Sequence, residues 1–370
     1  MLNRLRNYLR SLFRNQSTHI NIDSSIYDNL VLFLQVSMHD LIKFESKLLS
    51  KALDDVANDF QLGYQILNYN FDGIKNNKPS QIILIPPKYE LWPYLFLAIK
   101  FVSVGIEVNF LYFGWAKNII KLLEKHKKSK EYESLRFFDV EEFTLSQGRG
   151  TLTLNFSESI NGIYANIPTF STVVVSKHAD IDFALAYILN HAFSFAGLKN
   201  SNIKRVILDK ECEQTFLDKL SNRIQFGIDT NLSQITSQIF IDKMQQSILE
   251  AISDGAELFF GTPEFIAKSY PQNLILNKIT PNMSIFQKKI YGPLLMILAT
   301  DFEISQLEMV LKKQPSKGII VFGDEQQVGA FLPRNTELYY VYRYPHQQLK
   351  RHNIIFENPA LEYVFESLGW

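Results

Sequence analysis

TVVVSKHADIDFALAYILNHAFSFAGLKNSNIKRVIL, residues 172–208, reads as an apolar strand, a long apolar helix and a second apolar strand. Asp180 stands where a helix N-cap is needed, and Gly197 follows the last turn of the helical pattern. A strand–helix–strand order of this length predicts two parallel strands joined by a right-handed crossover. The expected fold class is therefore α/β.

The same alternation continues on both sides of this segment. Residues 26–75 read as helical, and from residue 81 short apolar strands alternate with helices. The expected strands are 81–86, 107–113, 135–140, 151–156, 172–176, 205–208, 258–260, 274–276, 294–299 and 318–322. The expected helices are 92–104, 116–126, 180–196, one that begins near 211, 237–253 and 303–312. We therefore expect two successive α/β modules with parallel-type sheets behind a helical N-terminal region.

The module boundaries are placed where this pattern changes. The helical N-terminal region covers residues 1–75, the first module 76–160, the second module 161–333 and a C-terminal tail 334–370. The segment 145–161, which contains two of the chain's sixteen glycines, is the expected seam between the modules. A chain of 370 residues is long enough for two or more domains, which agrees with this division.

The composition excludes several classes of protein. Apolar residues make up 46% of the chain, which is enough to bury a core rather than stay disordered. Basic and acidic residues balance at 38 each, so no long-range attraction to nucleic acid is expected. Cys212 is the single cysteine, which excludes an internal disulfide and a CxxC metal or redox site. These features fit the cytoplasm, a reducing compartment.

The first fourteen residues, MLNRLRNYLRSLFR, form an amphipathic basic pattern. Leucines and a phenylalanine share one helical face, and arginines occupy much of the rest. Met1–Arg14 is open to three interpretations: a peripheral membrane contact, an organelle presequence, or a terminal helix packed on its own domain. The apolar stretch 91–115 contains a proline and two charged residues, so we expect a buried helix and strand there rather than a membrane span.

Two segments of the second module carry a family resemblance: DGAELFFGTPEF at 254–265 and NLILNKITPNMSIFQKKIYGPLL at 273–295. They resemble the aldehyde dehydrogenase superfamily, in which a GA…GG strand precedes a segment ending in EEIFGPVL. HADID at 178–182 resembles the family's DADLD, and Phe195-Ala196-Gly197 resembles the NAG before its nucleophile. The match is good over 163–325. The resemblance implies a Rossmann-like, nucleotide-binding-type first module and a catalytic-type second module.

The resemblance assigns chemical roles to five positions. The family's cysteine nucleophile falls on Asn200, and the glutamate that activates the hydrolytic water falls on Asn166, 34 residues earlier. The asparagine that helps to bind the oxyanion falls near Tyr89. The lysine and the second glutamate, which hold the cofactor ribose, fall on Leu111 and Lys289. All five positions have lost the family's side chain, and a carboxamide such as that of Asn200 is not a useful nucleophile near neutral pH.

This pattern predicts a pseudoenzyme, which keeps the fold of the family without its catalytic side chains. Such a protein would act by binding a protein partner or a small molecule, with no cofactor, metal or nucleic acid, and a homodimer is compatible with the resemblance. The alternative is an NAD(P)-dependent oxidoreductase that acts on an aldehyde or acyl group through a non-standard site and needs NAD or NADP. A third alternative is a membrane-surface or assembly component that uses Met1–Arg14.

Four further features have a chemical and a structural interpretation. Cys212 begins a helix, but three neighbouring acids oppose a thiolate. GRG at 148–150 offers Arg149 to an anion, although it leads into a strand and lacks the third glycine of a dinucleotide motif. His191 lies in an apolar helix, where a hydrogen-bonded core histidine is expected. RYPHQQLKR at 343–351 mixes aromatic and basic residues that suit a partner or nucleic acid, and we expect a solvated tail.

Overall fold

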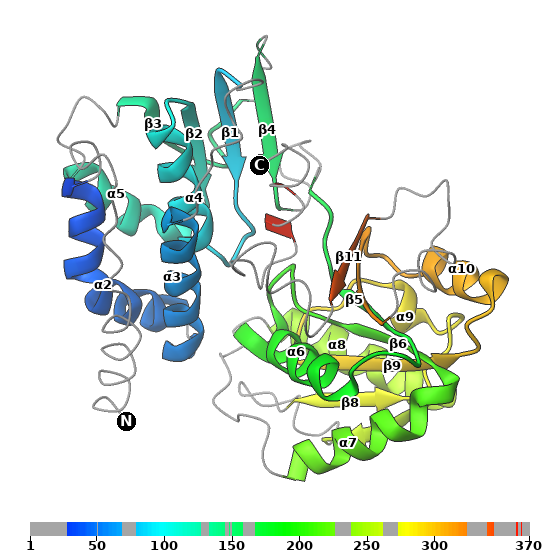
Figure 1. Cartoon of the computed structure of the whole chain (residues 1–370). Coiled ribbons are helices and arrows are strands. Elements are labelled where there is room, and N and C mark those ends of the chain that lie inside the picture. The colour runs from blue at the N-terminus through cyan, green and yellow to red at the C-terminus, as the bar shows by residue number, and fades with distance from the viewer. Residues whose placement is uncertain are drawn as a thin grey trace.

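The computed structural model describes residues 28–49, 51–68, 79–126, 133–144, 148, 150–157, 167–225, 238–261, 273–323, 339–343, 360–361 and 364. Within these residues the chain forms two α/β modules, each built on its own sheet (Figure 1). The N-terminal helices lie with the first module, on the left of Figure 1, and the second module lies on the right. Met1–Arg14, with its three interpretations, lies outside the described residues.

The first module is a four-stranded parallel sheet in the order β3–β2–β1–β4. Its strands are β1 (Gln81–Ile85), β2 (Glu107–Tyr112), β3 (Leu135–Asp139) and β4 (Thr151–Asn155). Helix α4 (Trp92–Ser103) connects β1 to β2, and α5 (Lys117–His126) follows β2. The sequence predicted these elements and their parallel pairing. Apolar residues surround most of α4, which is why nearly the whole helix is buried.

Two N-terminal helices, α2 (Asp28–Leu49) and α3 (Leu53–Asn68), form a hairpin that packs on α4. Aromatic rings make this contact, because the ring centroid of Phe60 lies 4.6 Å from that of Trp92 and 5.3 Å from that of Phe96. The turn between α2 and α3 is thereby held beside the loop that follows β1. This turn supplies part of the site described below.

The second module is a seven-stranded sheet in the order β11–β10–β5–β6–β9–β8–β7, parallel throughout except between β7 and β8. The strands are β5 (Thr172–Val175), β6 (Arg205–Asp209), β7 (Glu257–Phe260), β8 (Leu274–Asn277), β9 (Leu294–Thr300), β10 (Gly318–Phe322) and β11 (Tyr339–Arg343). The helices are α6 (Ile181–Phe193), α7 (Glu213–Gln225), α8 (Gln238–Ser253), α9 (Ser284–Gln287) and α10 (Ile304–Lys313).

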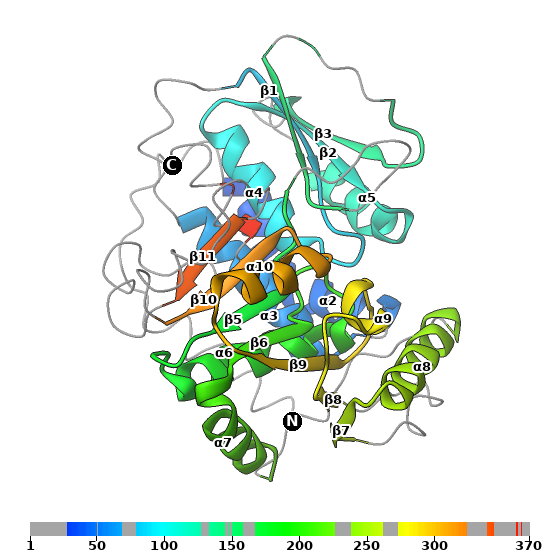
Figure 2. The same ribbon diagram turned by 90° about the vertical axis from the view of Figure 1, so that its right-hand side faces the viewer.

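The helices of the second module cover both faces of its sheet (Figure 2). Helices α6 and α7 pack on one face, and α8, α9 and α10 pack on the other. This two-sided burial explains why β5, β6 and β10 read as continuous apolar runs rather than as alternating patterns. Asp180 caps α6 as predicted, because its carboxylate accepts the backbone N–H of Phe183 at 3.1 Å.

Two segments differ from the sequence prediction. Strand β11 lies within the expected tail, yet it extends the second sheet as a parallel partner of β10. Arg343 therefore ends an edge strand, and residues 344–351 lie outside the described residues. The expected seam 145–161 also differs in part, because β4, which lies inside it, pairs with β1 of the first sheet; the range between β4 and β5 includes the expected boundary between residues 160 and 161. The chain crosses between the modules after β4 and before β5.

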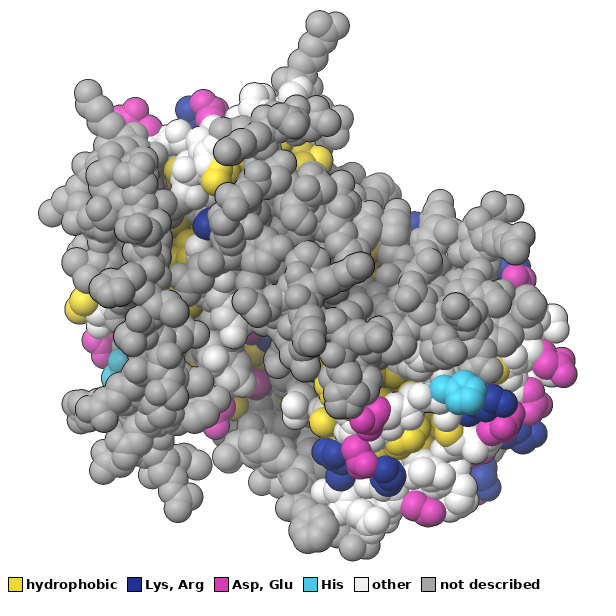
Figure 3. All heavy atoms as spheres, in the orientation of Figure 1, with side chains coloured by type: hydrophobic (Ala, Val, Ile, Leu, Met, Phe, Trp, Pro, Cys, Tyr) yellow, Lys and Arg dark blue, Asp and Glu magenta, His cyan; other side chains and the backbone are white. Residues whose placement is uncertain are grey.

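The apolar stretch 91–115 forms α4 and β2 inside the first module, as predicted. None of the helices that the structure describes is long and apolar enough to span a bilayer. On the face shown in Figure 3, the described acidic and basic side chains are interspersed over the second module. That mixture agrees with the zero formal net charge of the chain.

Candidate functional site

The turn after α6 is the centre of the candidate site, because it leads to the position that resembles the family's nucleophile. Phe195, Ala196 and Gly197 have positive φ angles of 52°, 50° and 67°. This left-handed backbone is unfavourable for residues other than glycine, so surrounding contacts must hold it. One contact comes from the N-terminal hairpin, where Asp55 Oδ2 accepts the backbone N–H of Phe195 at 2.8 Å.

Two glycines of the resembling motifs meet beside this turn. The backbone N–H of Gly292, in the IYGP motif, donates to the carbonyl oxygen of Gly197 at 3.1 Å. A Cβ on Gly197 would overlap the carbonyl oxygen of Gly292, and a Cβ on Gly292 would overlap the sulfur of Met244. These glycines therefore have a packing role, since the two loops approach too closely for a side chain.

Asn200 connects the two modules at this site. Its Nδ2 donates to the carbonyl oxygen of Phe156, just after β4, at 3.2 Å. Its Oδ1 accepts from Lys289 Nζ, also at 3.2 Å. The amino group of Lys289 lies 5.2 Å from the ring centroid of Tyr291 as well. The structure thus brings together two of the five positions identified in the sequence, Asn200 and Lys289.

The other three positions lie elsewhere. Asn166 is outside the described residues. Tyr89 lies in the loop between β1 and α4, where its carbonyl oxygen accepts from Lys51 Nζ at 2.5 Å and burial raises the pKa of its hydroxyl. Leu111 is 1% exposed on β2, in an apolar cluster on the sheet face opposite to α4. The other buried members of this apolar cluster are Ile83, Ile85 and Val140.

Charged side chains that are largely removed from water meet between the α2–α3 hairpin, the β1–α4 loop and the turn after α6. We call them the inter-module charge cluster, and its members are Glu45, Lys51, Asp59, Glu90 and Lys199. Lys51 Nζ pairs with Glu45 Oε1 at 2.7 Å, and Lys199 Nζ pairs with Asp59 Oδ1 at 2.5 Å. Both amino groups also lie over the Phe195 ring, 4.4 Å and 3.8 Å from its centroid. Ionic and cation–π contacts therefore hold the turn after α6 against the first module.

Glu90 is the least compensated acid of this cluster. It is 2% exposed, and its Oε1 has no hydrogen-bond partner in the described part of the chain. Burial raises the pKa of Glu90 to about 7, an effect that Lys199 opposes and Asp59 reinforces. Burial disfavours the charge of Lys199, but Asp59 and Glu90 outweigh burial and its pKa is raised. The cluster therefore gains or loses a proton near neutral pH.

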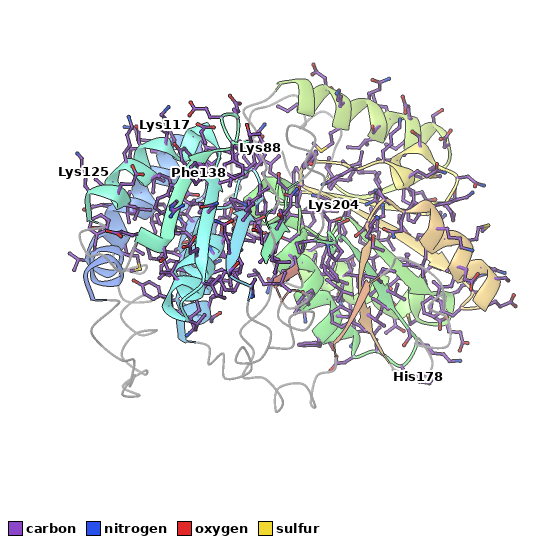
Figure 4. All side chains as sticks on the ribbon, turned by 90° about the horizontal axis from the view of Figure 1, so that it is seen from above. Lys88, Lys117, Lys125, Phe138, His178 and Lys204 are labelled. Carbon is purple, nitrogen blue, oxygen red and sulfur yellow. The ribbon has the colours of Figure 1, made fainter. Side chains whose placement is uncertain are left out.

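A second group of charged side chains lies beside Gly292, and we call it the Lys204 cluster. It consists of Lys204, Arg205 and Lys289. Lys204 is 4% exposed, and its Nζ donates to the carbonyl oxygen of Gly292 at 2.5 Å. Burial, together with the charges of Arg205 and Lys289, lowers the pKa of Lys204 to about 7. Figure 4 shows Lys204 on the side of the second module that faces the first.

Cys212 and the two histidines near α6 do not extend this site. Cys212 lies beyond the opposite end of β6 from Asn200, and burial raises the pKa of its thiol to about 11. His191 Nδ1 donates to the carbonyl oxygen of Tyr187 at 2.8 Å, which confirms a hydrogen-bonded, structural histidine. His178 lies at the far edge of the second module (Figure 4).

The remaining sequence candidates lie at the amino end of the first sheet or outside the described residues. Gly150 accepts the backbone N–H of Ser80 at 3.1 Å, where β1 and β4 begin, while Arg149 is outside the described residues. Across the described ranges, no group of three acidic, histidine or cysteine side chains is arranged to hold a metal ion. The site is therefore built from amides, amines and the buried carboxyls.

Sequence reasoning missed both charged groups, although each left a signal. Lys199 and Asp59 are 140 residues apart, so no local pattern brings them together. Glu90 interrupts the apolar run around α4, and Lys204 directly precedes the apolar strand β6. A charged residue at the border of a fully buried element is such a signal, because burying it requires a partner.

Comparison with known proteins identifies the part of the chain that carries the turn after α6. Residues 146–318 match the sequence model of the aldehyde dehydrogenase family. The chain is 29% identical over 140 residues to 1-pyrroline-5-carboxylate dehydrogenase 1 of Halalkalibacterium halodurans, which covers 36% of this chain and 27% of that protein. An aldehyde dehydrogenase-like protein of Schizosaccharomyces pombe is 26% identical over 165 residues, covering 41% and 32%. The chain spans about a third of the length of the curated relatives it matches.

Structural likeness extends beyond the matched residues. Succinic semialdehyde dehydrogenase from Streptococcus pyogenes, solved in complex with NADP+, aligns with a TM-score of 0.63 and 14% identity. The alignment covers 86% of this chain and 80% of that chain, so it includes the first module. At this identity the likeness shows a shared fold.

Proposed function

Because residues 146–318 belong to the aldehyde dehydrogenase superfamily, we propose that this protein keeps the superfamily's fold without its catalysis and acts by binding. One observation carries the proposal. Phe156 and Lys289 engage both ends of the carboxamide of Asn200, the residue whose position resembles that of the family's nucleophile. A protein partner or a small molecule would be held here without turnover.

The chemistry of the described side chains supports an inactive site. A carboxamide is neutral and does not attack an aldehyde carbonyl near pH 7, unlike a thiolate. The chain's single thiol, at Cys212, has a pKa raised to about 11 and lies beyond the other end of β6. Neither residue therefore offers a thiolate at the turn after α6.

The two ribose positions do not fit a dinucleotide held in the family's manner. The family supplies a carboxylate to ribose hydroxyls, whereas Lys289 supplies a cation that already donates to Asn200. The family's lysine position is Leu111, which is 1% exposed and has no polar atom on its side chain. This disagreement supports a protein that has lost the use of NAD and NADP.

Cofactor binding and turnover test the proposal. Calorimetric titration with NAD and NADP to millimolar concentration is expected to show no binding. A panel of aldehydes with either cofactor is expected to yield no reduced nicotinamide. Asn200→Cys is the matched control, because alkylation of its new thiol shows whether small molecules reach this position. Turnover by the unaltered protein that Asn200→Ala abolishes would contradict the proposal.

A second candidate function is an NAD(P)-dependent oxidoreductase that acts on an aldehyde or acyl group through a non-standard site. Glu90 favours it, because a buried carboxyl with a pKa of about 7 beside the turn suits general acid–base chemistry. This candidate requires NAD or NADP to bind and predicts turnover that Glu90→Gln lowers. The same calorimetric titration therefore separates the two functions.

A further inference from the structure

Lys204 presents a buried amino group whose hydrogen-bonding capacity is mostly unused. The residue is 4% exposed and precedes β6. A charged lysine has three N–H donors, and one of them reaches the carbonyl oxygen of Gly292. No second acceptor for this amino group occurs in the described part of the chain. A group that accepts hydrogen bonds would satisfy the other donors.

The charges around Lys204 are of its own sign. Arg205 and Lys289 are its charged neighbours, and both act against its protonation. The guanidinium of Arg205 donates to the backbone carbonyl oxygens of Phe286 and Lys288, which are neutral acceptors. Neither Lys204 nor Arg205 forms an ion pair with a carboxylate within the residues described. A buried cation without a counter-charge is costly, so an anion seated here would be bound favourably.

The two lysines of the inter-module charge cluster each have a carboxylate that compensates their charge. Lys51 is paired with Glu45 at 2.7 Å, and Lys199 is paired with Asp59 at 2.5 Å. Lys204 differs from both, although it is as deeply enclosed as Lys51. Within the described residues, two of these three amines have a carboxylate partner and Lys204 has none.

Lys289 is the exposed neighbour of the buried Lys204. Its side chain is exposed, and its amino group reaches Asn200 at 3.2 Å. The family has a carboxylate at this position, so the sequence change reverses the charge beside the nucleophile position. Lys289 therefore lies between Asn200, which it contacts, and Lys204, whose pKa its charge lowers. Amines and amides are suitable donors for carboxylate and phosphate oxygens.

We propose that Lys204 and Lys289, with Asn200, bind a small oxyanion, a carboxylate or a phosphate group, at the nucleophile position. The inference deepens and rests on the proposed function, because it names the class of ligand that the inactive site holds. Lys204 supplies the buried charge, and Lys289 supplies an exposed charge beside it. Asn200 Nδ2 and Oδ1 hold the loops on either side.

Thermal unfolding with simple anions tests the inference on the full chain. Sodium acetate and sodium phosphate are the probes, compared with sodium chloride at equal ionic strength. At pH 6 one or both probes are expected to raise the unfolding temperature by several degrees, and the stronger probe identifies the preferred anion. Stabilisation equal to that of chloride by both probes would overturn the inference.

The pH dependence of acetate binding provides a second readout. Acetate binds the protonated amine, and Lys204 loses its proton above pH 7 in the free protein. The affinity of the protein for acetate, measured by calorimetry, is therefore expected to fall about tenfold between pH 6 and pH 8. An affinity that does not change with pH would place the anion at a different, permanently charged group and contradict the inference.

Three variants locate the binding. Lys204→Met is expected to abolish acetate binding, and Lys289→Gln, an exposed change that should not affect folding, to weaken it at least threefold. Lys312→Met is the matched control at an exposed lysine on α10, with unchanged binding expected.

Equal acetate binding by Lys289→Gln and by the unaltered protein would contradict the inference, even if Lys204→Met does not fold. If the protein binds the anion and also turns over an aldehyde with a cofactor, the proposed function fails and this inference stands. If it shows neither anion binding nor turnover, this inference fails and the proposed function stands.

Discussion

The inter-module charge cluster and the Lys204 cluster handle buried charge in opposite ways. In the first, Lys51 pairs with Glu45 within the N-terminal hairpin, and Lys199 pairs with Asp59 across the boundary between the modules, beside the buried Glu90. In the second, Lys204 and Arg205 are buried without a carboxylate partner in the described part of the chain, and their acceptors there are backbone carbonyl oxygens. The comparison indicates that paired buried charge positions the turn after α6, while the uncompensated charge of Lys204 beside the same turn marks a place for a ligand.

Removing one partner of a buried pair should produce the largest effect. Lys51→Met leaves Glu45, which is 0% exposed, without its counter-charge. The free energy of unfolding is expected to fall by about 3–5 kcal/mol, measured by urea titration at pH 7.

The double variant Lys51→Met/Glu45→Leu is the control, because it removes both charges. It is expected to recover most of the loss, and the cycle of single and double variants isolates the pair. A single Lys51→Met variant as stable as the original would show that paired buried charge in the first cluster does not stabilise the fold, and would contradict the comparison.

The same change in the second cluster should have the opposite sign. Burial lowers the pKa of Lys204 from an ordinary 10.5 to about 7, so its charged form destabilises the fold below pH 7. This cost disappears as pH rises towards 10.5. Lys204→Met is therefore expected to stabilise by about 2 kcal/mol at pH 6 in anion-free buffer, with the gain vanishing near pH 10. Urea titrations across this range measure it, and destabilisation at pH 6 would mean that Lys204 is compensated.

Glu90 should give a smaller effect with its own pH window. Burial raises its pKa from an ordinary 4.5 to about 7, so stability is fully present below pH 4.5 and is lost as the carboxyl ionises towards pH 7. Glu90→Gln removes this ionisation. The variant is expected to be about 1 kcal/mol more stable than the original at pH 8 and equal to it at pH 4.5. A gain that is the same at both pH values would exclude ionisation as its cause.

Asn200 should also give a small effect on stability. Asn200→Ala removes the hydrogen bond to Phe156, which spans the two modules, and the hydrogen bond from Lys289 within the second module. A loss of about 0.5–1.5 kcal/mol in unfolding free energy is expected. Asn200→Asp is a useful companion, because a carboxylate beside Lys289 should strengthen that contact and compete with the proposed anion. If Asn200→Asp bound acetate more tightly, the assignment of the anion to this position would fail.

The second module could be predicted closely from the sequence, because its signals are local. Apolar runs bounded by glycine and a cap at Asp180 determine β5, α6 and β6, whereas the contact between Gly197 and Gly292 was not predicted, although both motifs were noted. Strand β11 was missed because its tyrosines and arginine do not form an apolar run. The buried pairs could not be predicted, because their members come from helices and loops that only the tertiary fold brings together.

The left-handed turn after α6 sets an order of assembly. Its two non-glycine residues are expected to cost about 1–3 kcal/mol each in that conformation, and Asp55 of α3 is one of the groups that offset this cost. Helix α3 is synthesised more than a hundred residues before the turn, so its carboxylate is already available when the turn forms. In a circular permutant that begins at β5, the turn would be synthesised before its acceptor, so the turn should form later during synthesis than in the native order.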